Sequence, residues 1–294
     1  MTYILAIGDR TYSSWSLRGW LTFAAFGLDL RVVSARMNTD AFAEMLEGFG
    51  GSRLVPALRI EEERRTIHVW DTLAMAETVS ERHPDIPLWP QDPTARGLAR
   101  AMVAEMHSGF TALRGDCPMN LRRRYAGFGP SEAVRADLAR IEVLWQRAAE
   151  IGGEGPWLFG AYSLADVFYA PVATRIATYD LPVGPAAARY VRTVLADPVF
   201  RRWRAMGLAE NHLQPGYDID LPTDPWPGPA PRSARVASSG TPVNAACLFS
   251  GKPTVADGLV EVDGQLLGFC NAFCRDKVAA DPDAWPEVSR LFDA

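Results

Sequence analysis

The sequence has little of what several classes of protein require. Only four cysteines occur among its 294 residues, too few for a disulfide scaffold. No stretch approaches the roughly 18 consecutive apolar residues that a membrane helix requires, and the first residues lack the basic lead and cleavage site of a secretory signal. The formal net charge of -5 gives no concentrated basic surface for phosphates. We therefore expect a cytoplasmic protein that binds neither nucleic acid nor a membrane.

Short strands and helices alternate in the N-terminal part of the chain. The composition, 48% hydrophobic and 22% charged, is that of an ordinary globular protein with one or two domains. Apolar patterning predicts four strands, at residues 3–7, 30–33, 55–60 and 67–69. It also predicts a helix after the first, second and fourth of these strands. This order predicts a small mixed sheet covered by helices, a thioredoxin-like domain over residues 1–83.

Residues 94–212 carry almost no strand signal and predict an all-helical second domain. Helical periodicity recurs at residues 94–115, 131–150, 163–179 and 185–195. Ser163, followed three residues later by Asp166, predicts a capping box at the start of one helix.

The last third of the chain changes character twice. Residues 213–240 are dense in Pro, Gly and Ser, which predicts a linker or an extended strap lying on the helical domain. Residues 241–294 predict a small tail, in which strands at 259–262 and 266–269 pair around the turn Asp263-Gly264. A short helix is expected from Asn271 to Ala279.

Three hydroxyls gather where the first strand leads into the first helix, at Ser13, Ser14 and Ser16. The free N–H groups of a helix N-terminus favour an anion. If that anion is a thiolate, a hydroxyl that donates to it lowers the pKa of the thiol and makes it a nucleophile at neutral pH. The same serines would also serve as caps of the helix, so both interpretations stay open.

Two further residue pairs in the same domain are candidates for ligand contacts, one at the start of a strand and one at the start of a helix. A proline that opens a strand, as in Val55-Pro56, sits at an edge or follows a cis bond, and a cis bond would let the Val55 backbone pair with an extended ligand. We predict that this bond is cis. Thr72 can donate to a carboxylate at the next helix start, and Arg53 can pair with a second one. Asp71 as an N-cap and Arg53 as a solvated side chain are the structural alternatives.

Together, Ser13-Ser14-x-Ser-x-Arg18, Val55-Pro56, Asp71-Thr72 and Ser163-x-x-Asp166 resemble a glutathione transferase of the serine-dependent, zeta-like bacterial type, over about residues 1–215. The resemblance implies an α/β thioredoxin-like N-terminal domain plus an all-α C-terminal domain. It also implies that Ser13, or alternatively Ser14, stabilises the thiolate of glutathione. The remaining contacts to glutathione that it implies are Val55 with Pro56 at the cysteinyl backbone, Asp71 and Thr72 at the γ-glutamyl end, and Arg53 near the glycyl end.

Two features of the sequence bear on the electrophile, the second substrate: a deviation from the family motif and one face of a predicted helix. Zeta-class enzymes carry cysteine at the third motif position, where this chain has Trp15, which weakens the expectation of maleylacetoacetate isomerase or cysteine-based reductase activity. His107, Phe110 and Arg114 fall on one face of a predicted helix that borders the electrophile site in this family. Arg175, on a later helix, is expected to do likewise. An interfacial role for His107 and an ion pair for Arg175 are the alternatives.

Three of the four cysteines, Cys247, Cys270 and Cys274, lie in the tail with the spacing Cys-x22-Cys-x3-Cys. This pattern resembles the small metal-binding YHS or TRASH modules, in which three thiolates meet at a hairpin and a helix start. Three soft ligands suit one zinc or copper(I) ion. No fourth cysteine or histidine lies nearby, so water or Asp276 would complete the set, or the cysteines are ordinary core residues.

The sequence therefore predicts a glutathione transferase that conjugates or isomerises a small electrophile through a serine-stabilised glutathione thiolate. Because the family builds its site beside a subunit interface, we expect a homodimer. A glutathione-dependent peroxidase is the alternative within enzymes. A non-catalytic sensor of glutathione or metal is the alternative from another class.

Overall fold

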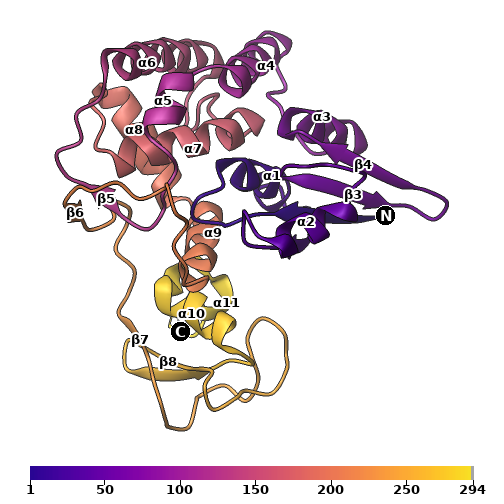
Figure 1. The fold of residues 1–294 in the computed structure, drawn as a ribbon, viewed down its shortest axis with the longest axis vertical. Coiled ribbons are helices and arrows are strands. Elements are labelled where there is room, and N and C mark those ends of the chain that lie inside the picture. Colours follow the sequence, from indigo (N-terminus) through magenta and orange to yellow (C-terminus); the bar gives the residue numbers. More distant parts are fainter. Residues whose placement is uncertain (293–294) are drawn as a thin grey trace. The chain divides into compact units, whose positions relative to one another are not determined.

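The computed structural model describes residues 1–292, which divide into two compact units (Figure 1). Unit 1 comprises Met1–Leu195 and Gln214–Pro227. Unit 2 comprises Ala196–Leu213 and the chain from Gly228 onward. The Pro-rich segment 213–240 is therefore shared between the two units.

A four-stranded mixed sheet forms the N-terminal part of unit 1. Its strands are β1 (Thr2–Ile7), β2 (Arg31–Ser34), β3 (Ala57–Glu61) and β4 (Thr66–Trp70), in the order β2-β1-β3-β4. β2 runs parallel to β1, while β3 is antiparallel to both β1 and β4. This sheet and its helices confirm the predicted thioredoxin-like arrangement.

Alternating side chains of β1 give the sheet two buried faces. Ile4 and Ala6 pack with Leu46 and Phe49, at the end of α2 (Asp40–Glu47). Helix α1 (Ser14–Ala24) covers the opposite face with α3 (Thr72–Arg82), as Figure 1 shows. There Gly19 of α1 approaches the loop before β3 so closely that a Cβ would lie 2.8 Å from the ring of Pro56. The start of α1 and this loop are therefore held together.

The rest of unit 1 is mainly helical, with α4 (Pro93–Ser108), α5 (Thr111–Asp116), α6 (Glu132–Gly152), α7 (Leu164–Thr178) and α8 (Pro185–Ala196). Every residue of α7 is buried, and the helix begins with the predicted capping box. The carboxylate of Asp166 accepts hydrogen bonds from the N–H groups of Ser163 (2.9 Å) and Leu158 (3.0 Å). Burial nevertheless raises the pKa of Asp166 to about 6.

The helix predicted over residues 94–115 is broken, which corrects the expected helix face. Gly109 ends α4 with an extended backbone, and Phe110 takes left-handed angles (φ 53°, ψ 43°) before α5 begins. A Cβ at Gly109 would lie 2.6 Å from the carbonyl oxygen of Glu105, so the close turn requires glycine. Phe110 consequently does not share a helix face with His107 and Arg114.

Residues 214–227 lie as an extended strap on unit 1. The short strands β5 (Arg124–Tyr125) and β6 (Thr223–Asp224) pair with each other. The side-chain amide of Asn120 donates to the carbonyl of Tyr217 (3.3 Å) and to the carboxylate of Asp218 (2.8 Å). Proline therefore prevents a helix here but not docking through side chains and a two-residue ladder.

Unit 2 is a small three-stranded sheet with helices. Its elements are α9 (Pro198–Ala209), β7 (Ala234–Val236), β8 (Leu259–Val262), β9 (Gln265–Gly268), α10 (Ala272–Ala280), a 3₁₀ turn (Pro282–Ala284) and α11 (Pro286–Ser289). The predicted hairpin and tail helix are present, and Asp263 and Gly264 both have positive φ, as a type I′ turn requires. Helix α9 falls within the range 94–212 assigned to the helical domain, yet it packs on α10 in unit 2. Arg201 of α9 binds Asp281 through two hydrogen bonds (2.8 and 2.7 Å).

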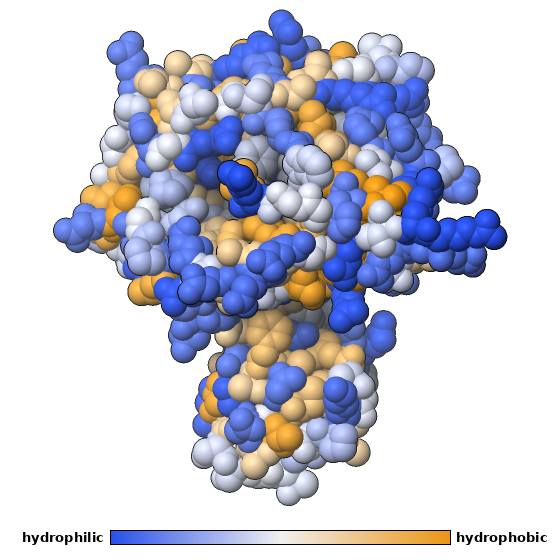
Figure 2. All heavy atoms as spheres, turned by 45° about the vertical axis from the view of Figure 1, so that its right-hand side comes forward, coloured by the Kyte–Doolittle hydropathy of each residue, from blue (hydrophilic) through white to orange (hydrophobic). Residues whose placement is uncertain are grey.

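Polar side chains cover most of the surface of unit 1 that Figure 2 shows, and apolar groups appear there in separate patches. Two large apolar side chains, Leu54 at 76% and Trp70 at 57%, are among the most exposed. None of the helices among residues 1–292 is long and apolar enough to cross a membrane.

Candidate functional site: two adjoining cavities and a cysteine cluster

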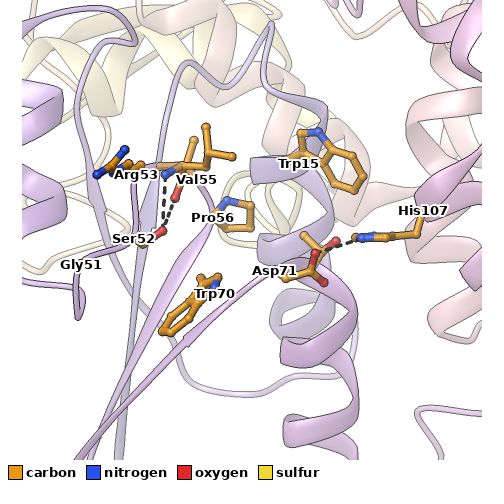
Figure 3. Close-up of a pocket in the computed structure, with 11 residues that line it drawn as sticks. Trp15, Gly51, Ser52, Arg53, Val55, Pro56, Trp70, Asp71 and His107 are labelled. Carbon is orange, nitrogen blue, oxygen red and sulfur yellow. Dashed lines mark hydrogen bonds and ion pairs between the residues drawn. The ribbon is translucent and has the colours of Figure 1, made fainter.

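The first cavity of unit 1, called cavity A here, has a volume of about 450 Å³ (Figure 3). It lies between the start of α1, the loop before β3 and the start of α3. The exposed Leu54 and Trp70 are part of its wall, and exposed apolar surface of this kind is typical of a binding site. Its lining consists of Trp15, Gly51, Ser52, Arg53, Leu54, Val55, Pro56, Trp70, Asp71, Thr72 and His107.

The loop before β3 forms one side of cavity A. The Val55–Pro56 peptide bond is cis, which confirms the prediction from the sequence. The hydroxyl of Ser52 donates to the carbonyl of Leu54 (2.8 Å) and accepts from its N–H (3.4 Å), so the loop is closed by its own contacts. In Figure 3, Arg53 and Asp71 lie on opposite sides of Pro56, so that cationic and anionic groups stand at opposite sides of the cavity.

Asp71 and Thr72 form the other side, where β4 turns into α3. One carboxylate oxygen of Asp71 caps α3 by accepting from the N–H groups of Leu73 (2.8 Å) and Ala74 (3.4 Å). The other oxygen lies 2.9 Å from Nε2 of His107, toward which it points in Figure 3. The Thr72 side chain is 2% exposed, and its hydroxyl has no hydrogen-bond partner among the described residues. A buried hydroxyl of this kind is costly unless a ligand completes its bonding.

The second cavity, cavity B, has a volume of about 360 Å³ and shares Trp15, Leu54 and Val55 with cavity A. The hydroxyl of Tyr12 is buried there and has no hydrogen-bond partner among residues 1–292. No sequence pattern had singled this residue out. Tyr12 immediately precedes the two serines of the motif, and that position is the only signal that could have identified it. The remaining lining of cavity B comprises Ser13, Ser14, Met37, Asn38, Phe42, Arg114, Pro118, Met119, Arg175 and Tyr217.

The serines at the start of α1 have distinct partners. Ser13 is the N-cap, accepting from the N–H of Ser16 (3.2 Å), and its hydroxyl lies 2.7 Å from the hydroxyl of Ser16. Ser16 in turn accepts from the N–H of Gly8 (3.0 Å). Ser14 accepts from the guanidinium of Arg175 (3.4 Å). Both Ser13 and Ser14 line cavity B, so the structure keeps both as candidates.

Three arginines surround these serines without a carboxylate partner among the described residues. Arg18, 1% exposed, donates to the carbonyls of Phe168 (3.0 Å) and Ser14 (3.4 Å). Burial, together with Arg175 and Arg114, holds the pKa of Arg18 well below its usual value. Burial and Arg114 likewise lower the pKa of Arg175 to about 10. Arg175 forms no ion pair among the described residues; its guanidinium donates instead to the carbonyls of Cys117 and Pro171 and to the hydroxyl of Ser14. The positive charge of these arginines beside the serines favours an anion in cavity B.

Trp15 separates the two cavities. Its ring lies 5.1 Å from the imidazole of His107, edge to face, while the guanidinium carbons of Arg18 and Arg114 lie 4.6 and 5.0 Å from its centre. These contacts fix the indole as a common wall. In the sequence, Trp15 stood out only because it replaces the cysteine of the zeta-class motif.

The structure distributes the predicted residues over both cavities. Arg53, Val55, Pro56, Asp71, Thr72 and also His107, which was expected on the electrophile side, line cavity A. Ser13, Ser14, Arg114 and Arg175 line cavity B. Phe110, 7% exposed, belongs to the lining of neither cavity, because the break at Gly109 turns it into the core.

A separate cluster lies in unit 2, where the sulfurs of Cys247, Cys270 and Cys274 are all within 4.8 Å of one another. Burial opposes ionisation of Cys247. The hydroxyl of Ser250 and the backbone N–H groups of Cys270, Phe249 and Ser250 outweigh this and lower the pKa of Cys247 to about 6. Burial raises the pKa of Cys274 to about 11. The fourth cysteine, Cys117, is buried in unit 1, where burial raises its pKa to about 12.

Known proteins resemble about two thirds of the chain. No protein-family profile matches the chain. The chain is 26% identical over 198 residues to a probable maleylacetoacetate isomerase of Caenorhabditis elegans, a match that covers 65% of this chain and 87% of the relative. It is 25% identical over 199 residues to the maleylacetoacetate isomerase of Rattus norvegicus, with the same shares of each chain.

Two solved structures show the same fold. A glutathione transferase homologue from Burkholderia with bound glutathione has a TM-score of 0.51 at 22% identity, covering 70% of this chain and 98% of its own. An Omega 2S glutathione transferase from Trametes versicolor has a TM-score of 0.52 at 18% identity, covering 69% and 94%. The predicted fold class, a thioredoxin-like domain followed by an all-helical domain as in glutathione transferases, is confirmed.

Proposed function

We propose that the chain is a glutathione transferase that binds glutathione in cavity A and conjugates or isomerises a small electrophile in cavity B. The observation that carries this proposal is the unpartnered, buried hydroxyl of Thr72 beside Asp71, in a cavity that adjoins the paired serines across Trp15. In the proposed pose Asp71 and Thr72 take the γ-glutamyl end, the backbone of Val55 pairs with the cysteinyl unit, and Arg53 faces the glycyl carboxylate. The fold shared with glutathione transferases supports the same assignment.

The hydrogen bonds at the start of α1 suit a hydroxyl that donates to a thiolate. When Ser16 donates its proton to Ser13, the Ser13 oxygen accepts two bonds and its own proton is left for the sulfur of glutathione. Each unit by which the pKa of the bound thiol falls stabilises the thiolate by about 1.4 kcal/mol. Ser14, already engaged by Arg175, is the alternative donor.

The electrophile is proposed to carry negative charge. Arg18, Arg114 and Arg175 have no described carboxylate partner, and Arg114 and Arg175 reach cavity B itself. A carboxylate on the electrophile would receive charge-assisted hydrogen bonds there, and the same field favours the thiolate over the thiol.

The experiment compares Ser13→Ala, Ser14→Ala and the parent chain. We expect Ser13→Ala to raise the pKa of bound glutathione and to lower turnover more than tenfold, with little change in affinity, because the hydroxyl contacts chiefly the thiolate. Difference absorbance of the bound thiolate against pH measures the first effect. An unchanged titration in Ser13→Ala would transfer the role to Ser14, and an unchanged titration in both variants would remove serine from the mechanism.

A panel of electrophiles and hydroperoxides separates the remaining alternatives. Turnover of hydroperoxides alone would make the chain a glutathione-dependent peroxidase, and thiolate formation without any turnover would make it a sensor. We also propose a cytoplasmic homodimer. Light scattering of the purified chain tests the dimer, and fractionation of cells tests the compartment.

For unit 2 we propose that Cys247, Cys270 and Cys274 bind one zinc or copper(I) ion, as in a YHS-like module. The support is that the sulfur of Cys247, distant in the sequence, lies within 4.8 Å of the sulfurs of Cys270 and Cys274 at the start of α10. Tetrahedral zinc bonds of about 2.3 Å to sulfur place neighbouring sulfurs about 3.8 Å apart, so only a small contraction is needed.

The test of the metal site is elemental analysis of the anaerobically purified parent chain beside Cys270→Ser and the matched control Cys117→Ser. We expect about one ion per chain in the parent and in Cys117→Ser, and a loss in Cys270→Ser. Less than about a tenth of an ion in all three, with the tail still resistant to protease, would leave the cysteines as core residues.

A further inference from the structure

Lys277 is a buried cation beside the cysteine cluster. It lies on α10, one helical turn beyond Cys274, and is 8% exposed. Its ammonium nitrogen lies 3.3 Å from the ring centre of Phe249 and 4.1 Å from that of Trp285. The carbonyl of Lys277 accepts from the indole N–H of Trp285 (3.2 Å), which fixes one wall of this aromatic cage.

The negative charge that such an ammonium requires comes from the sulfurs. No carboxylate among the described residues forms an ion pair with Lys277, although Glu287 acts on its charge without direct contact, less than Cys274 and Cys247 do and more than Cys270. Cys274, Cys247 and Cys270 all interact electrostatically with its charge. Aromatic faces stabilise a cation but do not neutralise it, so a buried ammonium without anions nearby would be costly.

Lysine is rare in this chain, so its use at position 277 is notable. Only two lysines occur in the sequence, Lys252 and Lys277, and every other basic side chain apart from histidine is arginine. Lys252 is exposed in the loop that follows Cys247. A compact ammonium fits between two rings, whereas a guanidinium is a broader planar group.

We propose that Lys277 is the built-in counter-charge of the cysteine cluster. The cluster then holds one divalent thiophilic ion of the zinc class, and the three thiolates, the ion and the ammonium together are neutral. This inference rests on the metal site proposed above. Three thiolates, one ammonium and one divalent ion sum to zero charge, whereas a monovalent ion leaves this partly buried site with an excess negative charge. Partial burial lowers the local dielectric constant and favours the neutral combination.

The hydrogen bonds around the sulfurs supply the rest of the site. Cys270 accepts from the hydroxyl of Ser250 (3.3 Å) and from the side-chain amide of Asn271 (3.4 Å). Asn271 also caps α10 by accepting from the N–H of Cys274 (2.8 Å). Such donors orient ligating sulfurs and spread their charge, but being neutral they cannot replace the charge of Lys277.

The experiment uses the full-length chain, with Co²⁺ as a spectroscopic probe for the zinc class and Zn²⁺ as competitor. Lys277→Met keeps an unbranched side chain that an aromatic cage accepts but removes the charge. Lys277→Arg keeps the charge, and Lys252→Met is the matched control. The readouts are affinity and the intensity of the thiolate-to-cobalt absorption band, which reports how many thiolates bind the metal. Near-ultraviolet circular dichroism checks that each variant keeps its packing.

In Lys277→Met we expect Co²⁺ affinity to fall at least about tenfold and the band to lose about a third of its intensity, as one thiolate leaves the metal. Lys277→Arg should recover only part of both readouts, because it restores the charge but its broader guanidinium fits less well between the two rings. Lys252→Met should leave both readouts unchanged. Unchanged affinity and band in a folded Lys277→Met would overturn the role of Lys277 while the metal site stands. Failure of the parent chain itself to bind Co²⁺ or Zn²⁺ would overturn the metal site and the role of Lys277 together.

Discussion

The two candidate sites organise sulfur in opposite ways. Cavities A and B present hydroxyls and positive charge, from Ser13 and from arginines such as Arg175, but no cysteine, so in the proposed function the thiolate arrives with the ligand. The cysteine cluster of unit 2 carries its own sulfurs and a single caged ammonium, Lys277. Under the proposed functions the first site receives an anion and the second receives a cation. This difference predicts opposite sensitivities.

Metal removal is expected to have the largest effect, and on unit 2 alone. An ion present at 1,000 times its dissociation constant stabilises the folded form by about 4 kcal/mol. A chelator should therefore accelerate amide hydrogen exchange of α10 strongly while α7 keeps its protection. Equal protection of α10 with and without chelator would erase the contrast between the two sites.

The second prediction concerns how the stability of unit 1 depends on pH, because unit 1 contains the buried carboxyl group of Asp166. Burial raises the pKa of Asp166 from 3.8 to about 6, so the folded chain binds more protons than the unfolded chain between these values. Stability contributed by the protonated form is then lost as pH rises from 4 to 6, by about 3 kcal/mol. Asp166→Asn keeps an acceptor for the cap, and its stability curve should lack this fall. Parallel curves for the two proteins would contradict the expectation.

The third prediction tests how tightly cavity A is built. Gly19→Ala places a methyl group against the ring of Pro56, and such overpacking typically costs about 1–3 kcal/mol. We expect lower thermal stability together with weaker glutathione binding. Gly97→Ala, in the interior of α4 with nothing within 4 Å of its Cβ, should instead stabilise by about 0.5–1 kcal/mol. Calorimetry and glutathione titration of both variants distinguish packing at the loop from a general glycine effect.

The smallest expected effect concerns the 2.9 Å contact between His107 and Asp71. Under the proposed function the amine of glutathione competes with His107 for Asp71. Partly exposed pairs contribute up to about 1 kcal/mol, so His107→Phe should tighten glutathione binding by no more than about fivefold. The phenyl ring retains the contact with Trp15. Weaker binding in this variant would show that His107 helps to hold the ligand, and His212→Phe in unit 2 serves as control.

Local chemistry made parts of this molecule predictable. The order of strands and helices follows from apolar periodicity, the cis bond from a proline opening a strand, and the tail hairpin from Asp263-Gly264. The capping box of Ser163 and Asp166 likewise uses only residues four positions apart or fewer. Each of these signals is complete within a few residues of the chain.

What the sequence could not provide depends on contacts between distant segments. The periodicity over 94–115 continues through Gly109, although the backbone there turns left-handed at Phe110. The pair of His107 with Asp71 joins residues 36 positions apart, and Trp15 becomes a wall only because α4 and α5 bring His107 and Arg114 to it. No local pattern encodes such meetings.

The course of the chain between the two units limits how the protein can be recombined. The chain passes from unit 1 to unit 2 after Leu195, returns after Leu213, and leaves again after Pro227. Joining two domains end to end produces a single junction, whereas this chain has three. Both units are therefore discontinuous in the sequence, and neither can be exchanged as a contiguous cassette.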